Sequence, residues 1–126
     1  MIFSRNVCIP ASTSPSDPQR ATLTVTAGVV RTVFVRWRWG SANLCGVRVR
    51  YCEVVHWPYT LDEWIVSNTT PLEIPDNLLL DTAPFVFVIE AYNEDTRYPH
   101  MVWVGFDIME ATAQDLLAQM ALLVAR

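Results

Sequence analysis

Two neighbouring stretches of alternating residues constrain the fold of this chain more than any other feature. Between Val33 and Trp39, valine and tryptophan alternate with phenylalanine and arginine, and between Val47 and Tyr51 apolar residues alternate with arginines. A period of two is typical of strands with one buried face. Because only a short run of mostly small residues at 40–43 follows the first stretch, we expect the two strands to pair as an antiparallel hairpin.

That hairpin would gather arginines on one of its faces, where we expect Arg36, Arg38, Arg48 and Arg50. Like charges on neighbouring strands repel each other, so counter-charges should lie nearby. The chain itself offers acids, namely Glu53, Glu90, Glu94 and Asp95. Acidic groups of a partner could serve instead, which would make the arginine face an interface. The sequence leaves both alternatives open.

Further runs predict roughly eight strands separated by turn signals, at 1–9, 21–27, 29–39, 47–51 with its continuation through 52–57, 63–67, 71–74, 84–92 and 101–108. The run at 84–92 is apolar on both faces, which favours a central strand, and Pro75 to Asn77 reads as a corner. Short, evenly spaced strands are typical of sandwiches and jelly rolls. We therefore predict an all-β, antiparallel, jelly-roll-like sandwich over residues 1–109. Its expected core includes Trp37, Val49, Phe87, Ile89 and Trp103.

Two segments fall outside this strand pattern. Residues 10–20 are rich in proline and form either a plain loop or an arm that lets residues 1–9 pair with a neighbouring subunit. Residues 110–126 change to a helical period, with Thr112 and Asp115 forming a capping box. The apolar stripe of this predicted amphipathic helix consists of Leu116, Leu117, Met120, Leu123 and Val124. It would pack on its own sandwich or on another copy.

Composition narrows the function. The chain has 126 residues and a net charge of -4, which disfavours nucleic-acid binding, and no segment has the length of a membrane span. The three cysteines (Cys8, Cys45 and Cys52) are expected to be free and buried. The His and Cys spacings do not match a metal site, and the sequence contains neither a cofactor-binding motif nor a catalytic one. We expect a protein without a cofactor that is not an enzyme.

Aromatic residues around Pro58 suggest one alternative function. Trp57, Tyr59 and Trp64 could form a flat platform for sugar rings, as in carbohydrate-binding sandwich modules. Tryptophan is equally suited to cores and to protein interfaces, so these residues could also be structural.

A resemblance covers about half of the chain, from Gly46 to Ile108. The runs GVRVRY, EWIVSN, PLEIP and FVFVIEAYNEDTRYPHMVWVGFDI resemble small β-sandwich proteins encoded in the structural modules of tailed phages and related mobile elements. The resemblance implies a virion component made in the host cytoplasm, such as a capsid decoration or adhesion domain, often a symmetric oligomer. We therefore expect a structural protein that contacts itself, as a trimer or a larger ring, and other virion proteins. A carbohydrate-binding module is the alternative.

Overall fold

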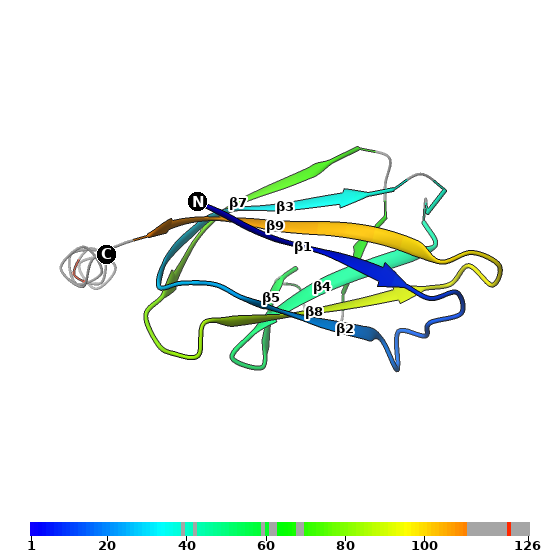
Figure 1. Cartoon of the computed structure of the whole chain (residues 1–126), viewed down its shortest axis with the longest axis horizontal. Coiled ribbons are helices and arrows are strands. Elements are labelled where there is room, and N and C mark those ends of the chain that lie inside the picture. Colours follow the sequence, from blue (N-terminus) through cyan, green and yellow to red (C-terminus); the bar gives the residue numbers. More distant parts are fainter. Residues whose placement is uncertain are drawn as a thin grey trace.

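The chain folds into two antiparallel sheets that pack face to face. The computed structural model describes residues 1–38, 40–41, 43–58, 60, 63–67, 70–110 and 121. Sheet A contains, in spatial order, β1 (Ile2–Ile9), β9 (His100–Glu110), β3 (Gly28–Trp37) and β7 (Leu72–Leu80). Sheet B contains β2 (Gln19–Thr24), β8 (Val86–Asn93), β4 (Cys45–Tyr51) and β5 (Val54–Trp57), with β6 (Ile65–Val66) also paired to β4. Figure 1 shows the sheets as two layers, so the predicted all-β sandwich is confirmed.

The strand pairs are nested within one another along the chain. The strands β4 and β5 pair near the middle of the sequence, β3 pairs with β7, β2 with β8, and β1 with β9. Two more pairings, β3 with β9 and β4 with β8, join these hairpin-like pairs into the two sheets. The strand β8 therefore lies between β2 and β4, and its predicted central position is confirmed.

The predicted hairpin between the first two alternating stretches is wrong. The strand β3 belongs to sheet A and β4 to sheet B, so the chain crosses between the layers after Trp37. Both strands alternate because each buries one face, and these two faces belong to opposite walls of the same core. The predicted corner at Pro75 is also wrong, because Pro75 lies inside β7 opposite Thr32. As an edge strand, β7 tolerates a residue that cannot donate a backbone hydrogen bond.

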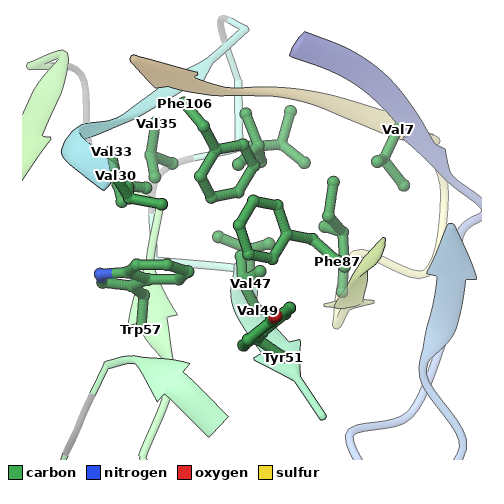
Figure 2. Close-up of a cluster of buried hydrophobic side chains, with 14 of the residues drawn as sticks. Val7, Val30, Val33, Val35, Val47, Val49, Tyr51, Trp57, Phe87 and Phe106 are labelled. Atoms are coloured by element: carbon green, nitrogen blue, oxygen red, sulfur yellow. The ribbon is translucent and has the colours of Figure 1, made fainter. Parts of the chain in front are cut away.

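The core is built from side chains of both sheets. Figure 2 shows Phe87 from β8 and Phe106 from β9 facing each other, with Trp57 and Tyr51 beside them. The ring centroids of Phe87 and Phe106 lie 4.4 Å apart, and Trp57 meets Phe87 edge-on at 5.6 Å. The indole Nε1 of Trp57 donates to Asp76 Oδ2 at 2.8 Å, which ties β5 of one sheet to β7 of the other.

The core prediction is right for three residues out of five. Val49, Phe87 and Ile89 are fully buried, whereas Trp37 is only half-buried at the end of β3. Trp103 is also only half-buried, so the prediction that it lies in the core is wrong. Its neighbours Val102 and Val104 point into the core, so alternation directs the Trp103 ring to the outer face of sheet A.

The proline-rich segment connects the two sheets in the described chain. The strand β1 pairs with β9 of the same chain, and the residues after it lead to β2 in sheet B. On the way, Ser12 N donates to Asp95 O and Thr13 N to Asn93 O, each at 2.9 Å. These bonds correspond to the loop alternative for residues 10–20.

Two further predictions meet the structure only in part. All three cysteines are free, as expected, but only Cys45 is buried, while Cys8 and Cys52 are exposed. The helical stripe of Leu116, Leu117, Met120, Leu123 and Val124 lies outside the described residues, so the C-terminal helix stays a prediction. Within the described residues, no helix is long and apolar enough to cross a membrane.

Candidate functional site

A charged cluster on the outer face of sheet B is the most distinctive polar feature of the described chain. Its centre is Glu90 on β8, and Arg20 on β2 and Arg48 on β4 are its direct cross-strand partners. Arg50 lies two residues beyond Arg48 on the same face. These four residues are called the Glu90 cluster below.

All three arginines contact the same carboxylate through Nε. Arg20 Nε donates to Glu90 Oε2 and Arg48 Nε to Oε1, each at 3.0 Å, and Arg50 Nε also donates to Oε1. The side chain of Glu90 is 2% exposed, whereas those of Arg48, Arg50 and Arg20 are 17%, 32% and 58% exposed. The arginines therefore cover a buried carboxylate on a face that would otherwise be open to water.

The charge of Glu90 is maintained by these contacts. Burial by itself would raise the pKa of Glu90, but hydrogen bonds from Arg50 and Arg48, together with their positive charges, hold the pKa below its ordinary value. Glu90 is thus a carboxylate at neutral pH, and it balances one of three guanidinium charges. The Glu90 cluster carries two positive charges in excess.

Several Nη atoms of the three guanidinium groups have no acceptor among the described residues. Within the part of the chain that the structure describes, Nη1 and Nη2 of both Arg20 and Arg48 have no hydrogen-bond acceptor. Arg50 donates through Nη1 to Glu53 O at 3.2 Å, and its Nη2 has no acceptor among the same residues. Among the residues that the structure describes, the cluster therefore has guanidinium donors to spare beyond those that bind Glu90.

An aromatic ledge borders the cluster on one side. The guanidinium carbon of Arg48 lies 4.1 Å from the centre of the Trp64 ring, and Trp64 meets Tyr92 edge-on at 5.0 Å. The ring of Tyr92 lies across Gly46, where an added Cβ would come within 2.2 Å of it. Gly46 thus lets Tyr92 lie flat on the sheet, and the ledge fixes the position of Arg48.

Acidic residues lie beyond both ends of the cluster. The exposed Glu53 follows Arg50 in the turn after β4. At the other end, the exposed Glu94 lies close enough to Tyr92 that, second to burial, its charge raises the pKa of that phenol. The positive region is therefore short, about two residue pairs along the strands.

The predicted arginine face does not exist as one surface. Arg36 and Arg38 belong to sheet A and its end, where Arg36 stacks on Trp103 at 5.3 Å, while Arg48 and Arg50 lie on sheet B. The alternative in which the chain's own acids balance the arginines is confirmed for Glu90. Arg20 was missed as a member, because its only sequence signal is a charge at the start of an otherwise uncharged strand.

The predicted aromatic platform is not formed by the described residues. Trp57 is 1% exposed and lies in the core, so it cannot present a face to a sugar. Trp64 is half-buried and carries Arg48 on its ring, and Tyr59 lies outside the described residues. Only Trp64 of the three therefore belongs to the surface described here.

A cavity of about 440 Å³ opens near the end of sheet A. Its lining is mainly apolar and comprises Trp37, Ile65, Val66, Thr70, Pro71 and Leu72. Val66 and Leu72 are exposed large apolar residues. The cavity is therefore a second candidate contact surface.

Metal-binding groups do not converge in the part of the chain that is described. His100 Nε2 and Asp95 Oδ2 lie 2.8 Å apart, but no group of three or more His, Cys, Asp or Glu residues is found there.

Comparisons of the chain with protein-family models, with curated proteins and with solved structures found no match. The assignment of a function depends on the arrangement of the chain's own residues.

Proposed function

We propose that this chain is a jelly-roll structural protein of a virion. In this proposal it is a capsid decoration or adhesion component, and it acts through protein–protein contacts without catalysis. The nested strand pairing carries the proposal. When the two-residue β6 is left aside, the eight longer strands pair first with last, second with seventh, third with sixth and fourth with fifth. This order of pairing is the one expected when a long antiparallel ribbon is rolled up as a jelly roll, and it supports that part of the proposal.

The architecture supports the proposed role because jelly rolls are common among viral capsid domains. The surface gives a second support. Val66 and Leu72 expose apolar side chains around the 440 Å³ cavity, beside the edge strand β7. Exposed apolar groups beside an unpaired strand edge favour contact with another protein. We take a second copy of this chain as the occupant, and a closed trimer or larger ring as the assembly.

Light scattering over a wide range of protein concentration tests the proposal. The wild-type protein should have the mass of a closed oligomer. Leu72→Glu and Val66→Glu should lower that mass, because each places a charge in the apolar contact. Val54→Glu is the matched control, since Val54 is as exposed but lies in β5, away from the cavity lining. A wild-type protein that remains monomeric at the highest concentration would contradict the proposal.

Carbohydrate binding is the alternative, and one observation favours it. Trp37 lines the 440 Å³ cavity, whose size lies in the range of small-molecule sites. A glycan bound there should quench tryptophan fluorescence in the wild-type protein but less in Trp37→Leu, without a change in mass. Fluorescence that is unaffected by a panel of sugars would exclude this alternative.

A further inference from the structure

The Glu90 cluster has more positive charge than its internal role requires. One arginine is enough to balance the charge of Glu90, yet three guanidinium groups contact it. Like charges held together on neighbouring strands repel, and partial burial of Arg48 and Arg50 weakens the screening of that repulsion by water. A second carboxylate on the outer side of the cluster would offset this repulsion.

We propose that the Glu90 cluster docks an acidic, extended peptide segment of a partner protein. Aspartate or glutamate side chains of that segment bind the outward Nη atoms of Arg20, Arg48 and Arg50. This site lies on the outer face of sheet B, and it does not depend on self-association through the cavity near β7.

The geometry of the arginines matches such a segment. Arg48 and Arg50 are two residues apart on β4, so their Cα atoms are about 7 Å apart, the same spacing as alternate residues of an extended peptide. Acids at every second position can therefore reach one arginine each. The guanidinium fork binds a carboxylate with two parallel hydrogen bonds, and the Nη donors of Arg48, which have no acceptor among the described residues, allow that geometry. Stacking on Trp64 holds the guanidinium group of Arg48 in place before the partner binds.

The surroundings favour a short acidic segment over a long polyanion. Glu53 and Glu94 lie beyond the two ends of the cluster, and the chain carries a net charge of -4. A nucleic acid or a sulfated polysaccharide would extend past the arginines and meet these carboxylates. An acidic peptide can place two or three carboxylates on the cluster and continue with neutral residues.

A titration with a defined peptide tests the proposal. The probe is a synthetic peptide with glutamate and serine in alternation, and its matched control carries glutamine in place of glutamate. Calorimetry at low ionic strength should detect binding of the glutamate peptide to the full chain, with affinity at least about tenfold higher than that of the glutamine peptide. Added salt should weaken the binding.

Variants of the protein locate the site. Arg48→Gln and Arg50→Gln should each lower the affinity for the glutamate peptide by about tenfold. Arg36→Gln is the matched control and should leave the affinity unchanged, because Arg36 also stacks on a tryptophan but lies on sheet A. Arg20→Gln is a third variant for the case in which the other two unfold, because Arg20 is the most exposed member of the cluster. It should lower the affinity for the glutamate peptide by a smaller factor.

Three results would overturn the proposal. One is a folded wild-type protein that does not bind the glutamate peptide, which would leave the cluster with a role only in holding β2 and β4 to β8. Another is an equal loss of affinity in Arg36→Gln. The third is tighter binding of heparin or single-stranded DNA than of the peptide, with the same dependence on Arg48.

Discussion

The rings of Phe87 and Phe106 stack across the core at 4.4 Å, with 29° between their planes. Phe87 comes from β8 in the middle of sheet B and Phe106 from β9 in the middle of sheet A. Both side chains are fully buried. This pair therefore joins the two sheets at their centres, and its loss should destabilise the whole sandwich.

Replacing Phe87 with alanine should lower the free energy of unfolding by about 3–5 kcal/mol, because a buried ring is removed and a cavity remains. Chemical denaturation measures this change. Phe34→Ala is the control, since Phe34 is half-buried and packs near Trp103, with 6.3 Å between the ring centroids; it should cost about 1–2 kcal/mol. Similar losses in the two variants would show that the Phe87–Phe106 stack is not central to stability.

The Glu90 cluster predicts a dependence of stability on pH. The folded-state pKa of Glu90 is below its ordinary value of 4.5, so its stabilising contribution is complete above the unfolded-state pKa. The contribution is lost as the pH falls through the folded-state pKa. Glu90→Gln should cost about 1–3 kcal/mol at pH 7. Urea denaturation between pH 7 and strongly acidic pH should show a smaller acid-induced loss in Glu90→Gln than in the wild type. Parallel curves for the two proteins would contradict this prediction.

The cysteines should differ in reactivity. Cys8 and Cys52 are exposed, while Cys45 is fully buried, and burial, with smaller effects of Asp95 and Glu94, raises its pKa to about 11. A thiol reagent should modify Cys8 and Cys52 in the folded protein and reach Cys45 only after unfolding, because the thiolate is the reactive form. Mass spectrometry of digested protein identifies the modified residues. Labelling of Cys45 at the rate of Cys8 would contradict the structure.

Gly46 should not tolerate a side chain. An added Cβ would lie 2.2 Å from the ring of Tyr92, which must then move and disturb the edge contact with Trp64. Gly46→Ala should therefore cost about 1–3 kcal/mol of unfolding free energy. The same substitution in a Tyr92→Ala background should cost much less, because the ring is absent. If Gly46→Ala lowers the free energy of unfolding equally in both backgrounds, the clash with the Tyr92 ring is not the cause of the loss.

The positions of most strands could be predicted from the sequence, with β7 beyond Ile74 as an exception, whereas the neighbours of each strand could not. The alternation at Val33 and Val35 indicates which face of β3 is buried, but it gives no information about which strands pair with β3. The pairing of β3 with β9 and β7 depends on contacts far apart in the sequence. Trp103 shows a related failure, because its aromatic character suggested burial while the phase set by Val102 and Val104 placed it outside.

The candidate site could be predicted only in fragments. The sequence offered four arginines and four possible acidic partners, and of these only Arg48, Arg50 and Glu90 form salt bridges with one another in the described residues. Arg20 and Tyr92 join the surface through the positions of β2 and β8, which a local pattern does not contain. The prediction that Trp57 belongs to an exposed platform was wrong because the sequence around Pro58 does not distinguish a tryptophan in a loop from one at the end of a buried strand.

The nested pairing also sets an order of events during synthesis of the chain. Sheet A has β9 between β1 and β3, and sheet B has β8 between β2 and β4, so each sheet depends on a strand that leaves the ribosome late. While those strands are still missing, β1 and β2 have emerged with their apolar faces uncovered and without their pairing partners. The strands β1 and β2 can therefore form their pairings with β9 and β8 only after the last third of the described chain has been synthesised. Folding of β1 and β2 into their sheets therefore depends on β9 and β8 being present.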